Sequence, residues 1–135
     1  MKSLFLLLLT YSFCIITSCT NDNNNDSSIE IWNLRHVSGG IAGINNNFNQ
    51  GLIIWKLNPQ NSTLTVENNN SDGNYDGLDS GTYSYTIQSN SGNSYIIIDS
   101  NEFGGITSSQ NELIIDQNMT SNGSGADGFI LRFEN

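Results

Sequence analysis

The chain has 135 residues, of which 36% are hydrophobic and 13% are charged, and its formal net charge at pH 7 is −9. This length fits a single domain, and the excess of 13 acidic over 4 basic residues argues against a nucleic-acid partner, because phosphate binding needs a basic face. One His and two Cys are too few for a Cys/His zinc cluster, and the apolar content is too high for a fully disordered chain.

The N-terminal segment combines the basic residue Lys2 with a short apolar stretch that ends at Cys19. The stretch is shorter than the roughly 20 apolar residues that span a bilayer, so we expect a signal peptide over residues 1–18. The sequence Ile16-Thr17-Ser18-Cys19 resembles a bacterial lipobox. This resemblance implies cleavage by signal peptidase II and lipid attachment to Cys19. The alternative is an ordinary secretory signal in which Cys19 is incidental.

Residues 19–28 are expected to form a lipidated, flexible tether, because positions 20–28 contain only polar residues and bury nothing. Thr20 stands where the inner-membrane retention signal of Gram-negative lipoproteins has Asp, so we expect an outer-membrane lipoprotein. Asp22 and Asp26 resemble the acidic export tether of surface lipoproteins in the Bacteroidota. Both the periplasmic and the surface face of the outer membrane remain open.

Residues 29–135 are expected to form one all-β domain. Short runs of alternating apolar and polar residues are separated by Asn, Gly, Ser and Asp clusters, and no run shows the period of a helix. We predict eight strands, at residues 29–37, 52–58, 63–68, 81–89, 94–99, 103–108, 112–117 and 128–134. Short turns between most of them favour antiparallel neighbours, and closing the sheet removes its two exposed edges. The predicted fold is therefore an antiparallel up-and-down barrel of about eight strands.

Three connections are long, at residues 38–50, 69–80 and 118–127. They follow the first, third and seventh predicted strands. Successive loops of an up-and-down meander alternate between its two ends, so odd-numbered connections share an end. We expect all three long loops around one mouth of the barrel and tight turns at the other.

Four strand sequences occur in a characteristic order: Ile31-Trp32-Asn33-Leu34, Ile53-Ile54-Trp55-Lys56-Leu57, Thr63-Leu64-Thr65-Val66 and Gly81-Thr82-Tyr83-Ser84-Tyr85. This order resembles that of small lipocalin-like lipoproteins of the Bacteroidota and spans nearly the whole domain. Position 30 holds Glu, where the lipocalin signature has a Gly two places before the Trp. The resemblance implies a calyx that binds a small apolar molecule.

Large aromatic residues on the predicted strands are candidates for lining a ligand pocket, since aromatic walls suit apolar ligands. The candidate ligand-binding residues are Trp32, Trp55, Tyr83, Tyr85 and Phe129. The alternative is that they fill the core, because eight strands enclose little more than their own side chains. Alternation places Lys56 and Arg132 on the outer face, and it points His36 inward together with Trp32 and Leu34.

The sequence Asp72-Gly73-Asn74-Tyr75-Asp76-Gly77 reproduces the first half of an EF-hand calcium loop. Asp79 adds a third carboxylate, so a weak calcium site is predicted at Asp72, Asn74, Asp76 and Asp79. The closing Glu of an EF-hand loop is missing, because the twelfth position is Tyr83. The alternative is an acidic turn.

Motifs for catalysis are missing from the sequence: it has no Gly-x-Ser-x-Gly nucleophile elbow, no phosphate-binding loop and no dinucleotide fingerprint. We therefore do not expect an enzyme. We expect an envelope-anchored binding module for a small hydrophobic molecule or an envelope partner. The alternative is a structural or interaction lipoprotein, with a filled barrel or a β-sandwich that recognises carbohydrate or protein through its long loops.

Overall fold

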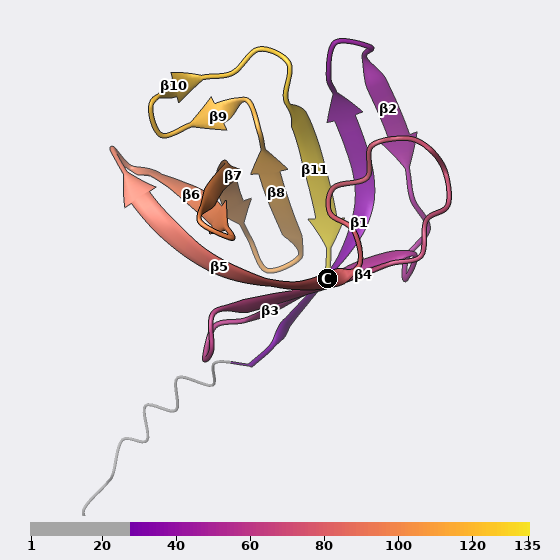
Figure 1. The fold of residues 1–135 in the computed structure, drawn as a ribbon, viewed down its shortest axis with the longest axis horizontal. Helices are drawn as coiled ribbons and strands as arrows, with labels where there is room; N and C mark the ends of the chain where they lie inside the picture. The colour runs from indigo at the N-terminus through magenta and orange to yellow at the C-terminus, as the bar shows by residue number, and fades with distance from the viewer. Residues whose placement is uncertain (1–27) are drawn as a thin grey trace, which may run out of the picture.

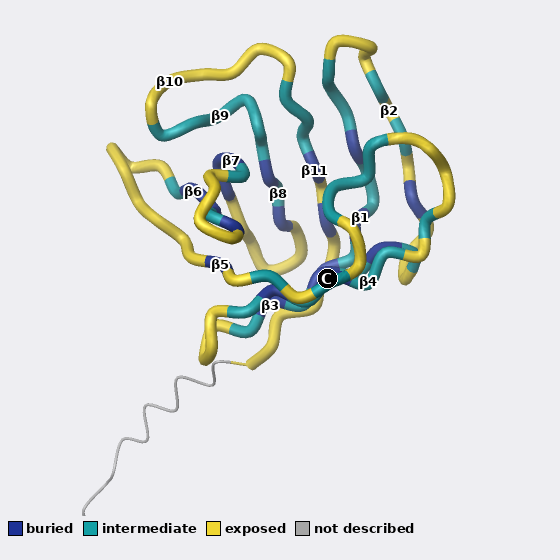
Figure 2. Tube along the Cα trace, in the orientation of Figure 1, coloured by how far each residue is buried: buried dark blue, intermediate teal, exposed yellow. Residues whose placement is uncertain are grey.

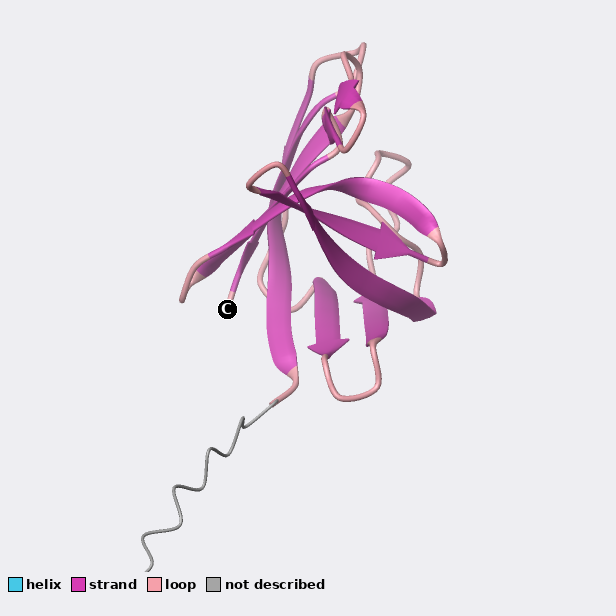
Figure 3. Cartoon of the chain, turned by 90° about the vertical axis from the view of Figure 1, so that its left-hand side faces the viewer, coloured by secondary structure: helices cyan, strands magenta, loops and turns pink. Residues whose placement is uncertain are grey.

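The computed structural model describes residues 28–135, and this part of the chain is built from β-strands (Figures 1 and 3). The strands are β1 (Glu30–Gly39), β2 (Ile44–Asn47), β3 (Ile53–Asn58), β4 (Thr63–Asn68), β5 (Gly81–Asn90), β6 (Asn93–Ile98), β7 (Asn101–Ser108), β8 (Glu112–Asp116), β9 (Met119–Thr120), β10 (Gly123–Ser124) and β11 (Phe129–Glu134). Eight of them form a closed antiparallel barrel in the order β1-β3-β4-β5-β6-β7-β8-β11, which the pairing of β11 with β1 completes. The predicted fold class is confirmed, and each predicted strand corresponds to one of these eight. Across residues 28–135, no helix is long and apolar enough to cross a membrane.

The additional strands lie within two of the predicted loops. The first half of β1 pairs with β3, whereas its second half, from His36 to Gly39, pairs with β2. Strands β2 and β3 therefore lie one after the other along the same edge of β1 (Figure 1). Backbone groups in the second half of β1 need partners, and the loop segment Ile44–Asn47 supplies them despite its polar sequence. Strands β9 and β10 form a small hairpin within the connection 118–127.

A β-bulge in β1 reverses the alternation of its side chains. The register between β1 and β11 shifts between Leu34 and His36. Trp32 and Leu34 face the core before the shift, and Val37 is buried after it. The expectation that His36 points inward is therefore wrong, because the bulge inserts one extra residue into the strand. His36 lies outside, with its Nε2 atom 2.6 Å from Oδ1 of Asn45.

Inward-facing side chains fill the barrel, and Figure 2 shows burial concentrated in the middle of the strands. Trp55 packs at tilted angles against Phe133 and Phe103, with ring centroids 4.8 and 5.9 Å away. The largest fully buried side chains are Trp55, Phe133, Leu34, Ile53, Leu64, Ile96, Leu113, Ile115, Leu131 and Val37. Each large apolar side chain buried in this way contributes about 1.5–3 kcal/mol. All of these residues belong to the chain segment that runs from β1 to β11. Residues 28–135 therefore contain both the complete barrel and the side chains that fill it.

Alternation correctly predicted the outer face. Lys56 forms an ion pair with Glu67, and Arg132 forms one with Glu112 at 3.3 Å. Charged groups on this face remain partly exposed, where ionisation costs little.

Candidate functional site

The three long connections meet at one end of the barrel, as the strand count predicted, and they converge on Phe129. The ring of Tyr75, from the connection 69–80, stacks on the ring of Phe129. The amide of Gly40 donates to the carbonyl of Gly128 at 3.1 Å, which joins the first long connection to the residue directly after the third. The amide of Gln117 donates to the carbonyl of Phe129 at 2.9 Å. This end of the barrel is therefore closed by contacts between loops.

Residues 69–80, which we call the cover segment, lie over the core at this end. Tyr75 and Leu78 pack against the core cluster. The hydroxyl of Tyr75 accepts a hydrogen bond from Nε2 of Gln117 at 2.7 Å, and Nδ2 of Asn68 donates to the carbonyl of Leu78 at 3.2 Å. Burial raises the pKa of the Tyr75 hydroxyl above its usual value, and the negative charge of Asp76 adds to this. No strand of the described chain falls within the cover segment, and its one backbone–backbone hydrogen bond to another segment runs from the amide of Asn69 to the carbonyl of Leu52 at 3.0 Å. Beyond Asn69, contacts that involve side chains hold it in place.

Trp55 lies directly beneath the cover segment. Gly77 has a φ of +98°, and a Cβ added there would lie 3.6 Å from Cζ2 of Trp55 and 3.1 Å from Cδ2 of Leu131. Gly77 therefore lets the backbone approach the indole, on the edge of the ring that also carries Nε1. That Nε1 group is buried and has no hydrogen-bond partner among the residues that the structure describes. An unpaired buried N–H costs about 1–3 kcal/mol.

Trp32 provides an internal comparison, because it is the cross-strand partner of Trp55 on the neighbouring strand. Its exposed fraction is only 3%, yet its Nε1 donates to Oε2 of Glu30 at 3.1 Å. Glu30 thus satisfies the indole of Trp32. Of the two adjacent indoles, only Trp55 is left with an unpaired N–H in the described chain.

The remaining predicted ligand-binding residues, Phe129, Tyr85 and Tyr83, do not share one site. Phe129 is half-buried and lies at the loop end, against Tyr75. Tyr85 is buried within the core cluster, and Tyr83 is half-buried with its hydroxyl donating to the carbonyl of Asp79 at 2.9 Å. The structure therefore brings Trp55 and Phe129 to the covered mouth, together with Tyr75, Leu78 and Gln117, which sequence reasoning missed. A large aromatic residue within a polar loop was the available signal for Tyr75.

The predicted calcium ligands do not converge. Oδ2 of Asp76 accepts a hydrogen bond from Nδ2 of Asn70 at 2.9 Å, which braces the cover segment from within. Asp72, Asn74 and Asp79 are exposed. Among residues 28–135, no group of three or more His, Cys, Asp or Glu side chains is arranged to hold a metal ion. The loop also differs from an EF-hand in that Tyr75 packs against the core cluster.

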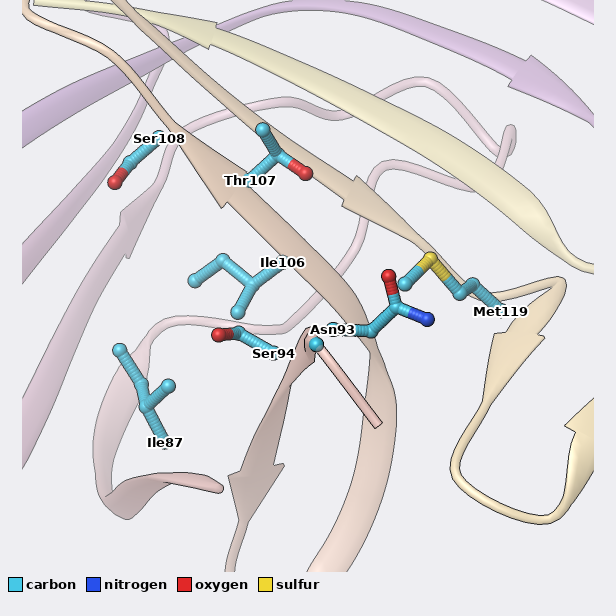
Figure 4. A pocket seen from close by; sticks show the side chains of 8 residues that line it. Ile87, Asn93, Ser94, Ile106, Thr107, Ser108 and Met119 are labelled. Atoms are coloured by element: carbon cyan, nitrogen blue, oxygen red, sulfur yellow. The ribbon is translucent and has the colours of Figure 1, made fainter. Parts of the chain in front are cut away.

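A second candidate region lies at the β5–β6 hairpin. Strand β4 pairs with β5 only from Gly81 to Ser84, so the rest of β5 has β6 as its ladder partner and Ile87 is 52% exposed. A pocket of about 380 Å³ opens beside this hairpin (Figure 4). None of its lining residues is charged; they are Ile87, Gly92, Asn93, Ser94, Ile106, Thr107, Ser108 and Met119.

Comparisons of this chain with protein-family models, with curated proteins and with solved structures found no match. Function must therefore be inferred from two regions of the molecule, the covered mouth at the loop end and the uncharged pocket at the β5–β6 hairpin.

Proposed function

We propose that this chain is a lipid-anchored binding barrel of the bacterial envelope, which takes up a small apolar molecule at its long-loop end. The observation that carries the proposal is the fully buried Trp55, whose Nε1 group lacks a partner within the described residues and lies under a loop. The anchor rests on the lipobox at Cys19, which lies outside the described residues. We place the protein at the outer membrane, on its periplasmic or surface face.

Ligand entry in this proposal requires the cover segment to move, because the core side chains already fill the barrel. Tyr75 and Leu78 are the side chains that can leave, since they come from a segment without strand pairing. Side chains on the barrel strands cannot leave without breaking the hydrogen-bond ladder. Loop opening of this kind occurs on microsecond to millisecond timescales in other proteins. The ligand would then occupy the space of Tyr75 and Leu78, against Trp55 and Leu131.

A second candidate function is favoured by the pocket of about 380 Å³ at the β5–β6 hairpin. In that case the barrel is a filled scaffold that recognises an envelope protein or a carbohydrate. The exposed Ile87 and the neighbouring Asn and Ser side chains would make the contacts. The covered mouth would then be a closed part of the core.

The two candidates are distinguished by binding of N-phenyl-1-naphthylamine, a neutral apolar fluorophore, to residues 28–135. We expect a saturable rise in its fluorescence. Tyr75→Ala should tighten binding by about threefold to tenfold, because loss of the ring stack raises the population of the open cover segment. Ile87→Ser is the matched control and should leave binding unchanged. Loss of binding in Ile87→Ser favours the hairpin pocket, and lack of binding by the parent protein contradicts uptake at the loop end.

The anchor is tested by replacing Cys19 in the full chain. Cys19→Ala should abolish incorporation of radiolabelled fatty acid and leave the signal peptide, residues 1–18, uncleaved. If the parent protein takes up no label, or the variant takes up as much label as the parent, the lipid anchor is contradicted.

A further inference from the structure

We infer that the ligand at the loop end is electrically neutral and carries one hydrogen-bond acceptor, which Nε1–H of Trp55 binds. This inference rests on the proposed function and specifies the chemical class of its ligand. It depends on the unpaired indole and on the distribution of charge around the barrel.

The donor is defined by the contrast between two adjacent indoles. Trp32 donates to Glu30 at 3.1 Å, whereas Trp55 has no acceptor anywhere in residues 28–135. An indole N–H only donates, so its partner must supply an oxygen or nitrogen lone pair. The side chains around the indole are apolar: Phe133 and Phe103 pack against its ring, and Leu131 lies beside Gly77. The complementary ligand is an apolar body with one acceptor.

The charge distribution excludes an anionic ligand. Each Lys or Arg of the described chain lies on the outside in an ion pair with a glutamate: Arg35 with Glu134, Lys56 with Glu67 and Arg132 with Glu112. A carboxylate buried beside Trp55 would thus meet no cation, and burial of an unpaired charge is strongly unfavourable. The cover segment also carries Asp72, Asp76 and Asp79, whose negative charges repel an approaching anion.

A cationic ligand is excluded by the same reasoning. No carboxylate of the described residues is buried, so an ammonium group in the core would find no counter-ion there. The Nε1–H group only donates, so an ammonium, which also only donates, leaves it unpaired even where it lies over the face of the indole ring. A neutral carbonyl, ester, ether or hydroxyl oxygen is the remaining class of partner.

Three ten-carbon molecules test this inference on residues 28–135 by displacement of N-phenyl-1-naphthylamine at neutral pH: methyl nonanoate, decanoate and decane. We expect methyl nonanoate to bind about fivefold more tightly than decane, since one hydrogen bond separates them. Decanoate should bind at least about tenfold more weakly than the ester. Trp55→Phe should remove the preference for the ester over decane, and Trp32→Phe, the matched control, should keep it.

Several outcomes overturn the inference. Binding of decanoate as tight as that of the ester contradicts a neutral ligand. Equal binding of ester and decane by the parent protein shows that the indole N–H binds no acceptor. An ester preference retained in Trp55→Phe shows that another group binds the ester oxygen. The parent comparison needs no variant, and far-UV circular dichroism checks that Trp55→Phe is folded. If the fluorophore and all three molecules fail to bind the parent protein, the proposed function itself fails, which is a distinct result.

Discussion

The ring of Tyr75 stacks on the ring of Phe129, with centroids 4.0 Å apart and planes inclined by 15°. Tyr75 comes from the connection after β4, whereas Phe129 is the first residue of β11, which pairs with both β1 and β8. Phe129 is therefore fixed by the barrel, and Tyr75 ties the cover segment to it. The stability of this contact controls access to Trp55 in the proposed function.

Two substitutions at Tyr75 separate the stack from the hydrogen bond. Tyr75→Phe keeps the ring and loses the bond from Gln117, so the free energy of unfolding should fall by about 0.5–1.5 kcal/mol. Tyr75→Ala also loses the stacked ring and should cost about 2–3 kcal/mol. Urea denaturation of residues 28–135 measures both values. Equal losses in the two variants would mean that the ring contact contributes nothing.

Two glycines in the first long connection provide a matched pair for the packing against Phe129. Gly40 and Gly43 have φ values of +70° and +63°, so alanine introduces similar backbone strain at each. A Cβ at Gly40 would lie 2.6 Å from Cε1 of Phe129, whereas a Cβ at Gly43 meets nothing within 4 Å. We expect Gly40→Ala to destabilise the protein by about 1–3 kcal/mol more than Gly43→Ala. Thermal unfolding of both variants checks this, and identical melting temperatures would show that the Phe129 ring moves aside freely.

The buried tyrosines predict a loss of stability at alkaline pH. Burial raises the pKa of Tyr75 and of Tyr85 in the folded state above the unfolded value of 10.0, and nearby Asp76 and Glu30 act in the same direction. Above about pH 10 the unfolded chain releases these protons more readily than the folded chain, so the free energy of unfolding falls as the pH rises. Tyr75→Phe should reduce this slope. Urea denaturation across this pH range measures it, and an unchanged slope in the variant would contradict a contribution from Tyr75.

Calcium should not stabilise the protein, because Asp72, Asp76 and Asp79 do not gather around one point. We expect the same melting temperature in excess Ca²⁺ and in excess chelator. A rise with Ca²⁺ that disappears in the double variant Asp72→Asn with Asp76→Asn would show that the loop rearranges to bind the ion.

The sequence alone determined the strands of the barrel and the arrangement of its loops. Regular alternation, as in Ile53, Trp55 and Leu57, identifies a strand with one buried face, because side chains on a strand point to opposite faces in turn. Polar turn residues mark where strands end. The parity of the connections then placed the three long loops at one end, which requires an antiparallel meander and a correct count of its strands.

Only the tertiary structure decided which individual side chains occupy the mouth. The bulge in β1 that turns His36 outward and the pairing of β2 along β1 depend on hydrogen bonds to distant strands, which local sequence does not encode. Tyr75 belongs to a segment whose sequence is typical of a polar turn. It packs inward because it stacks on Phe129 and accepts a hydrogen bond from Gln117, and both of these residues are far from it in the sequence. The unpaired N–H of Trp55 likewise depends on the residues that pack around it in the folded barrel. Its neighbours along the chain do not predict it.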